Sequence, residues 1–214
     1  MAVMKACQAN KVKRCVVTSS CVSVLAVDED KIPEGNLFNE THWSNPDGTK
    51  CQAMPYFESK TRAELAAWDF VAKLPDGEKF ELATVCPSFV MGPPLKKGET
   101  GTSVGFMKGA IMGQLPAVSS EHMQSVDVRD VAKCHVLAME APGAAGERYI
   151  CCQGTPSYQE YVKPVADKFK PLGWPVSDNY VEKEEANIWY FDRSKSEKLG
   201  LKYTPWDKTV VDMA

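Results

Sequence analysis

Two residues with complementary chemistry, Tyr56 and Lys60, stand four positions apart in the sequence. They belong to a segment, residues 55–71, that is rich in helix-forming residues and contains no Gly or Pro after its first position. Pro is well tolerated at that first helical position. Residues i and i+4 share one face of a helix, so we expect the phenol and the ammonium side by side. A nearby cation favours the phenolate, which would let the phenol exchange a proton with a substrate oxygen near neutral pH.

The same spacing also fits an ordinary amphipathic helix with Tyr56 at the surface and Lys60 in solvent. The preceding sequence favours a site. Residues 15–27, CVVTSSCVSVLAV, begin as the β-branched, apolar type of strand that parallel sheets bury on both faces, and the strand is expected to end at Thr18-Ser19-Ser20. Ligands of open α/β sheets bind beyond the carboxyl ends of the strands, so these hydroxyls are expected to point into a site. Alternatively, they only cap the strand through local backbone bonds.

Strands and helices are expected to alternate along the rest of the chain. A helix over residues 1–10 precedes the first strand, and a long polar loop, residues 28–54, contains Trp43, which we interpret as its anchor. A second buried strand, residues 80–85, breaks sharply at Cys86-Pro87-Ser88, and this order indicates a parallel α/β arrangement. The later predictions are a flexible loop at 96–105, strands at 124–128, 148–152 and 187–191, and helices at 106–112, 131–140 (with Asp130 as N-cap), 157–169, 194–199 and 205–213.

The composition argues against several classes of protein. The chain has 214 residues, of which 44% are hydrophobic and 25% charged, as in globular proteins. A net charge of −3 argues against nucleic-acid binding, and no apolar run is long enough to span a membrane. The eight cysteines form no C-x-x-C pair, and the three histidines are not spaced with them as a zinc site requires, so no metal is expected. Because the N-terminus lacks the apolar core of a signal peptide, we predict reduced thiols and a cytoplasmic protein.

Six short motifs occur in a fixed order along nearly the whole chain: CVVTSS, YFESK, VCPSFVMGP, SVDVRDVAKCHVLAME, RYICC and FDRSKSEKLGLKYTP. Together they resemble the extended short-chain dehydrogenase/reductases of the NAD-dependent epimerase/dehydratase superfamily, in the dihydroflavonol-reductase and cinnamoyl-CoA-reductase-like branch. The resemblance implies an α/β fold with a partial doubly wound, Rossmann-type parallel sheet. Residues 1–94 would be the C-terminal half of the dinucleotide-binding domain, and residues 95–214 a small substrate lobe with a returning strand.

The resemblance also implies roles for five residues. Ser20 would hydrogen-bond the substrate oxygen, and Tyr56 would give that oxygen a proton in reduction and withdraw one in oxidation. Lys60 would favour the phenolate and hold the nicotinamide ribose hydroxyls. Pro87 and Ser88 would lie beside the nicotinamide ring, presenting backbone to it. The implied cofactor is NADP(H) rather than NAD(H).

In one respect the sequence departs from this family. Its members begin with a strand and a Gly-x-x-Gly-x-x-Gly turn that seats the cofactor pyrophosphate at a helix N-terminus, and no such motif occurs here. The chain looks like the C-terminal part of a reductase whose first βαβαβ half, on the order of a hundred residues, is missing. We expect this to leave the strand at residues 15–18 as an open apolar edge that invites pairing.

Two classes of function are therefore open. The first is an NAD(P)H-dependent oxidoreductase that acts on a CH–OH or carbonyl group of a small ketone, aldehyde or CoA-thioester, with Ser20, Tyr56 and Lys60 as its triad. A sugar-nucleotide epimerase or dehydratase would use the same triad. The second is a truncated, non-catalytic binding protein whose open sheet edge pairs with a second copy or with a complementing chain. Neither a nucleic acid nor a membrane is expected as a partner.

Overall fold

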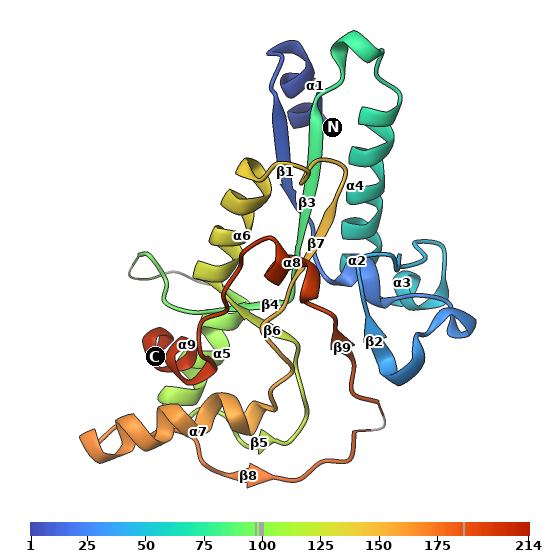
Figure 1. The fold of residues 1–214 in the computed structure, drawn as a ribbon. Helices are drawn as coiled ribbons and strands as arrows, with labels where there is room; N and C mark the ends of the chain where they lie inside the picture. Colours follow the sequence, from blue (N-terminus) through green and yellow to red (C-terminus); the bar gives the residue numbers. More distant parts are fainter. Residues whose placement is uncertain (97, 99–100, 186) are drawn as a thin grey trace. The chain divides into compact units, whose positions relative to one another are not determined.

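The computed structural model describes residues 1–96, 98, 101–185 and 187–214 (Figure 1). It divides into two compact units. The first comprises residues 1–88, 132–151 and 191–201, and the second comprises residues 89–131, 152–190 and 202–214. The chain therefore enters each unit more than once, and the predicted domain division at residue 94 stays a prediction. None of the helices in the described part of the chain is long and apolar enough to cross a membrane.

A parallel sheet forms the centre of the first unit, which confirms the predicted α/β class. Its strands lie in the order β1 (Arg14–Thr18), β3 (Glu81–Pro87), β7 (Arg148–Cys151). All three strands are parallel, so their carboxyl ends meet at one edge of the sheet. In open α/β sheets this is the edge at which ligands bind.

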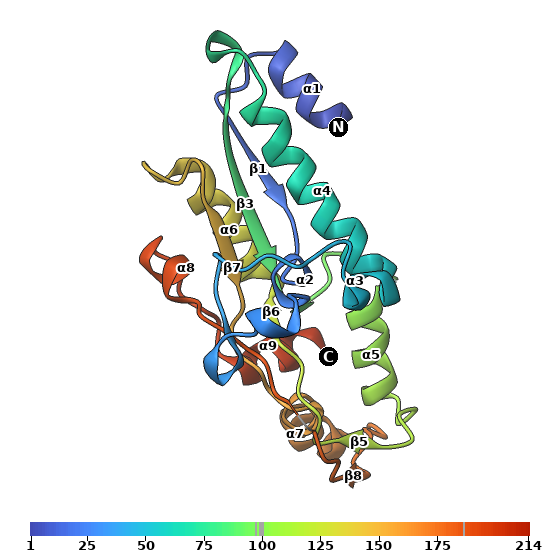
Figure 2. The same cartoon turned by 90° about the vertical axis from the view of Figure 1, so that its right-hand side faces the viewer.

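Helices cover both faces of this sheet (Figure 2). α1 (Ala2–Ala9) and α4 (Pro55–Ala72) lie against one face, and α6 (Val128–Glu140) runs along the other. Cys15 and Val17 project from β1 onto the first face, where they pack with apolar residues of α1 and α4. The side chain of Val16, between them, points toward the opposite face because side chains alternate along a strand.

The first strand is less buried than the sequence predicted. The apolar run predicted a strand covered on both faces, but four of the five residues of β1 are half-buried and Thr18 is exposed. The reason is its place in the sheet, because within the described part of the chain β1 pairs with a strand, β3, on one side only. The prediction that it forms an open edge is thereby confirmed.

The segment after β1 is more ordered than the predicted loop. The apolar residues that follow Ser20 form a buried helical turn, α2 (Val22–Leu25). The long polar segment contains short elements as well, and further short elements complete the first unit. They are 3₁₀ turns at Glu29–Lys31, Glu34–Asn36 and Asp76–Glu78, α3 (Thr49–Ala53), α8 (Ser194–Lys198) and β2 (Leu37–Phe38). β2 pairs with β9 (Tyr190–Phe191), of which Phe191 belongs to the first unit.

The described residues of the second unit form three helices and two short strand pairs. Apolar side chains of the helices make its core, in which Tyr161, Val162 and Val165 are fully buried. The helix that carries them begins with a capping box, in which Ser157 and Glu160 each bond the backbone N–H of the other. The elements are α5 (Thr102–Ile111), α7 (Tyr158–Phe169) with a 3₁₀ turn at Lys170–Leu172, α9 (Trp206–Met213), and the parallel pairs β4 (Phe89–Met91) with β6 (Ser125–Asp127) and β5 (Val118–Ser119) with β8 (Tyr180–Val181).

Some predicted boundaries are wrong. Asp130 is not an N-cap, because α6 begins at Val128 and places Asp130 inside its first turn. Its carboxylate instead accepts the backbone N–H and the hydroxyl of Thr204, both at 2.8 Å. The helix predicted from 106 begins at residue 102, and the strand predicted at 187–191 is limited to its last two residues. Residues 97, 99 and 100 of the predicted flexible loop lie outside the described residues.

Candidate active site

The helix α4 carries Tyr56 and Lys60 on one face, as the spacing predicted. Tyr56 follows the Pro55 that opens the helix, and 60% of it is exposed to solvent. Its phenol has no hydrogen-bond partner among the described residues, so it is open to an incoming molecule. Lys60 is half-buried, and its Nζ donates to the carbonyl oxygen of Thr18 at 3.1 Å. The ammonium therefore lies at the carboxyl end of β1.

The turn after β1 brings Ser20 to the same edge of the sheet. Ser20 is buried, and its hydroxyl accepts the backbone N–H of Val22 at 3.3 Å. The N–H of the next residue, Cys21, donates to the carbonyl oxygen of Pro87 at 2.9 Å, which joins this turn to the end of β3. The structure therefore gathers the Ser20 turn, the Lys60 ammonium and the end of β3 at the carboxyl edge.

Pro87 and Ser88 are buried at the end of β3, with part of their backbone already bonded. The carbonyl oxygen of Pro87 accepts from Cys21, and the N–H of Ser88 donates to the carbonyl oxygen of Cys151 at 3.1 Å. The hydroxyl of Ser88 also lies 3.4 Å from that carbonyl oxygen. These bonds fix the backbone of both residues at the ligand edge, and their role beside a nicotinamide ring stays a prediction.

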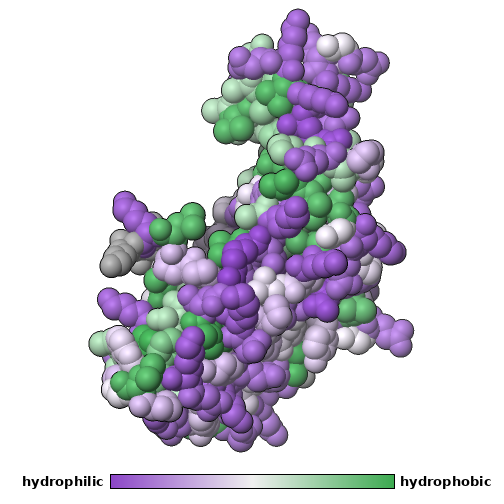
Figure 3. Space-filling model, turned by 60° about the vertical axis from the view of Figure 1, so that its left-hand side comes forward, coloured by the Kyte–Doolittle hydropathy of each residue, from purple (hydrophilic) through white to green (hydrophobic). Residues whose placement is uncertain are grey.

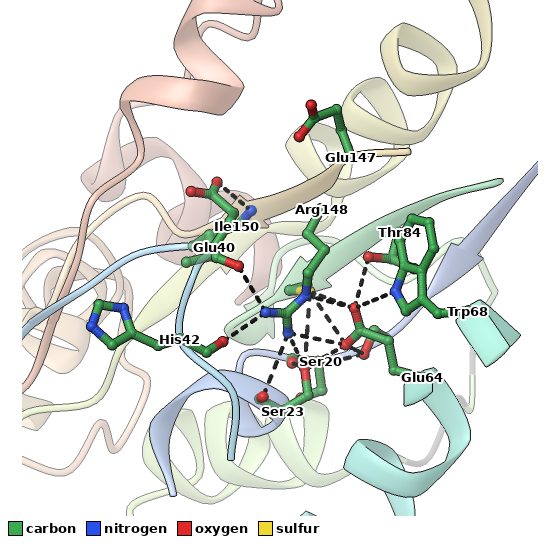
Figure 4. A network of polar contacts seen from close by, with 12 residues as sticks. Ser20, Ser23, Glu40, His42, Glu64, Trp68, Thr84, Glu147, Arg148 and Ile150 are labelled. Carbon is green, nitrogen blue, oxygen red and sulfur yellow. Dashed lines mark hydrogen bonds and ion pairs between the residues drawn. The ribbon is translucent and has the colours of Figure 1, made fainter. Parts of the chain in front are cut away.

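A buried ion pair that the sequence did not predict joins Arg148 and Glu64, close to Ser20 and Ser23 (Figure 4). Arg148 Nε donates to Glu64 Oε1 at 2.8 Å, and only 7% of Arg148 and 2% of Glu64 are exposed. A signal for Glu64 was present in the sequence. It falls one turn after Lys60 on α4, on the stripe that also buries Thr61 and Ala67, so a charge there requires a partner.

The carboxylate of Glu64 is saturated with donors. Oε1 accepts from Arg148 Nε and from the hydroxyl of Thr84, both at 2.8 Å. Oε2 accepts from the hydroxyl of Ser19 at 2.5 Å and lies 2.6 Å from the hydroxyl of Ser23. A carboxylate offers about four lone-pair sites, so this environment fits the ionised form. The network joins α4, the turn after β1, β3 and β7.

The same guanidinium also holds the long polar segment between α2 and α4. Arg148 Nη1 donates to the carbonyl oxygens of Glu40 at 2.9 Å and His42 at 2.7 Å. The Trp43 ring stacks on the guanidinium, with its centre 3.6 Å from Cζ. The interpretation of Trp43 as the anchor of this segment is therefore confirmed.

The network shifts the pKa of several groups. Burial alone would raise the pKa of Glu64, but the guanidinium of Arg148 and the hydroxyls of Ser19 and Ser23 outweigh it and lower that pKa below its ordinary value. Burial, together with the nearby carboxylate, raises the pKa of Cys86 to about 12. The site at neutral pH thus holds an ionised Glu64 and a protonated Cys86.

Parallel strands with helices on both faces, and polar groups gathered at the carboxyl edge, define a Rossmann-type α/β protein. No protein-family model matches the chain. The chain is similar to cinnamoyl-CoA reductase 1 of Arabidopsis thaliana, with 30% identity over 210 residues that cover 98% of this chain and 59% of that protein. It is also similar to the NADPH-dependent methylglyoxal reductase GRE2 of Saccharomyces cerevisiae, with 31% identity over 226 residues that cover 96% of this chain and 64% of that protein.

Solved structures agree with the sequence relatives. The crystal structure of Gre2 from Candida albicans matches with a TM-score of 0.81 and 27% identity, covering 99% of this chain and 67% of that one. The chain belongs to the extended short-chain dehydrogenase/reductase family, in the cinnamoyl-CoA-reductase and dihydroflavonol-reductase-like branch. It spans about three fifths of the length of the curated relatives that it matches.

Replacing Glu64 by Gln should destabilise the protein in a pH-dependent way. At pH 7 the change leaves the buried Arg148 charge without a counter-ion, at an expected cost of about 3–5 kcal/mol in the free energy of unfolding. The pKa of Glu64 is lowered in the folded state. The contribution of ionised Glu64 to the free energy of unfolding is therefore complete above its pKa in the unfolded chain, about 4.3. It is lost as the pH falls through its pKa in the folded protein.

The difference in the free energy of unfolding between the wild type and Glu64→Gln should consequently become smaller below about pH 4. Urea unfolding at pH 7, 5, 4 and 3.5 measures it. Glu58→Gln, on the same helix, is the control, because Glu58 forms an exposed ion pair with Arg62 and should have little effect at any pH. A difference that stays constant down to pH 3.5 would show that the Glu64 charge is not the source of the stability.

Proposed function

We propose that this chain carries the catalytic residues of an NADPH-dependent carbonyl reductase, which reduces a ketone, aldehyde or CoA-thioester. The observation that carries the proposal is the bond from Lys60 Nζ to the carbonyl oxygen of Thr18. It fixes the face of α4 that bears Tyr56 at the carboxyl end of β1, two residues before Ser20. The similarity to reductases at about 30% identity supports the same reaction class.

In this reaction the residues of the chain orient the substrate and supply the proton. A carbonyl oxygen would accept hydrogen bonds from the hydroxyl of Ser20 and the phenol of Tyr56, both of which stabilise the negative charge that develops there. When the carbonyl carbon takes a hydride, the phenol gives its proton to the carbonyl oxygen, so the carbonyl becomes an alcohol and Tyr56 becomes a phenolate. The Lys60 ammonium stabilises this phenolate until a proton from solvent restores it.

The residues present fit the nicotinamide end of a cofactor. Reduced nicotinamide, when bound, supplies the hydride. Lys60 Nζ uses one of its three N–H donors on Thr18 and keeps two for ribose hydroxyls. Pro87 and Ser88 lie at the same edge of the sheet, and their backbone is held there by hydrogen bonds. We propose NADPH rather than NADH because the similar yeast reductase is named as NADPH-dependent. We also propose a cytoplasmic location, since all eight cysteines are free thiols.

Tyr56→Phe should abolish turnover. The change removes only the hydroxyl that gives the proton, so kcat for NADPH-coupled reduction of an aldehyde or ketone should fall by about 100-fold or more while the fold is retained. Loss of NADPH absorbance, measured on the wild type first, reports the rate. The matched control is Tyr190→Phe, which removes another exposed phenol and should keep the wild-type rate. Near-normal turnover of Tyr56→Phe would show that the triad assignment is wrong.

A sugar-nucleotide epimerase or dehydratase would place the same three residues around a sugar. The two activities are separated by substrate. We expect turnover with small carbonyl compounds and none with UDP- or dTDP-sugars. Turnover of a nucleotide sugar alone would replace the reductase proposal by this alternative.

A second candidate function is supported by the open edge of β1. The N–H and C=O groups of successive residues point to alternate sides of a strand. The carbonyl oxygen of Lys13 and the N–H of Ser19 bond residues of β3, at 2.9 Å and 2.8 Å, so odd-numbered residues face β3. The backbone groups of Val16 therefore point to the open edge. Val136 and Met139 of α6 are exposed, and the carbonyl oxygen of Met139 accepts from Arg14 of β1 at 2.7 Å. Figure 3 shows hydrophobic residues exposed on one face of the molecule. We propose that, without catalysis, the chain acts as an interaction protein that pairs this edge with a second copy or a complementing chain.

Val16→Pro should block this pairing. Proline removes the N–H that faces the open edge, and the β1–β3 ladder stays intact because it uses the neighbouring residues. Sedimentation velocity should show a concentration-dependent dimer for the wild type and for Val16→Thr, which keeps the N–H and the branched shape. It should show a monomer for Val16→Pro. A wild type that is monomeric at all concentrations would remove self-association from the proposal.

A further inference from the structure

The candidate catalytic groups lie on two separate elements, and one carboxylate joins them. Ser20 follows β1, whereas the phenol and the ammonium lie on α4. Glu64 continues the catalytic face of α4 by one turn beyond Lys60, and its Oε2 accepts from the hydroxyl of Ser19, directly before Ser20. We infer that the buried Glu64–Arg148 pair is a positioning device, which fixes the Ser20 hydroxyl relative to the catalytic face of α4.

Both sides of the turn are held by this pair. On one side, the Ser19 hydroxyl donates to Glu64. On the other, the Ser23 hydroxyl lies 2.6 Å from Glu64 Oε2 and 2.7 Å from the carbonyl oxygen of Ser20, and it accepts from Arg148 Nη2 at 3.0 Å. The carboxylate thus touches the residue before Ser20 and the residue that bonds its backbone.

The Ser20 hydroxyl itself is left out of the network. Among the described residues it accepts one bond, from the N–H of Val22, and donates none. Its proton therefore remains available for a substrate oxygen, while its backbone is fixed by its neighbours. This division separates positioning, done by Glu64 and Arg148, from contact with the substrate.

The position of the carboxylate is set by Arg148. The guanidinium is a planar fork of donors with no acceptor, and it is fixed independently by two carbonyl oxygens of the polar segment and by the Trp43 ring. The carboxylate of Glu64 accepts hydrogen bonds from both Nε and Nη2 of Arg148, at 2.8 Å and 3.3 Å. A neutral side chain of the same shape cannot accept from the fork and from both serines with equal strength.

The inference rests on the proposed reductase function, because it assigns Ser20 a role toward substrate. A displaced Ser20 hydroxyl would weaken a bond that strengthens as charge develops on the substrate oxygen. The expected kinetic result is therefore a lower kcat with little change in KM. A general loss of folded protein would also lower the apparent kcat, but it would be accompanied by an equal loss of stability throughout the first unit.

Three variants test the inference: Glu64→Gln, the double variant Glu64→Gln/Arg148→Met, and the exposed control Glu58→Gln. Replacing both members of a buried ion pair by neutral groups commonly restores stability, whereas removing one does not. The measurements are urea unfolding, amide hydrogen exchange of residues 19–23 compared with β3, and kcat and KM with NADPH and an aldehyde.

In Glu64→Gln we expect exchange at residues 19–23 to accelerate about tenfold or more beyond the change in β3, and kcat to fall by about tenfold with KM within about twofold. The double variant should regain stability but keep the fast exchange and the low kcat. Recovery of exchange and kcat together with stability would overturn the inference. If the wild type has no turnover, the proposed function fails, and the exchange measurements still decide whether the pair holds the Ser20 turn.

Discussion

A buried charge must be paired and fully hydrogen-bonded, and the first unit of this protein is arranged around that constraint. Glu64 enters the interior on the buried stripe of α4, where an isolated carboxylate would be strongly unfavourable. Arg148, at the start of β7, supplies the opposite charge, and hydroxyls from β3 and from the turn after β1 supply the remaining donors. One ion pair thus connects a helix, two strands and a turn.

This arrangement explains why the candidate site lies where it does. Two successive turns of α4 are tied to the end of β1, the first through Lys60 and the second through Glu64. The end of β3 joins the same edge through the bond between Cys21 and Pro87. The exposed Tyr56 lies on this face at the N-terminal end of α4, where an incoming substrate could reach it. Rigid secondary structure places the site, while among the described residues the Ser20 hydroxyl donates no bond and the Tyr56 phenol has no partner.

Much of this could be predicted from the sequence because it depends on local patterns. The apolar runs predicted β1 and β3, the four-residue spacing placed Tyr56 and Lys60 on one face, and the ordered motifs indicated the family. The Glu64–Arg148 pair was not predicted, because its members are 84 positions apart. The buried stripe of α4 indicates that Glu64 needs a partner, but not which residue supplies it. Only the fold brings the two residues together. The Asp130 prediction was wrong because α6 begins two residues earlier, and the partner that Asp130 has instead, Thr204, is distant in the sequence.

We propose that this chain seats the nicotinamide end of NADPH at the carboxyl edge of its sheet. The most direct test is a titration of the purified 214-residue protein with NADPH, followed by nicotinamide fluorescence, with Lys60→Ala in parallel. We predict saturable binding in the micromolar range that Lys60→Ala weakens by roughly tenfold or more. Absence of binding at millimolar NADPH, or equal binding by the wild type and Lys60→Ala, would contradict the account.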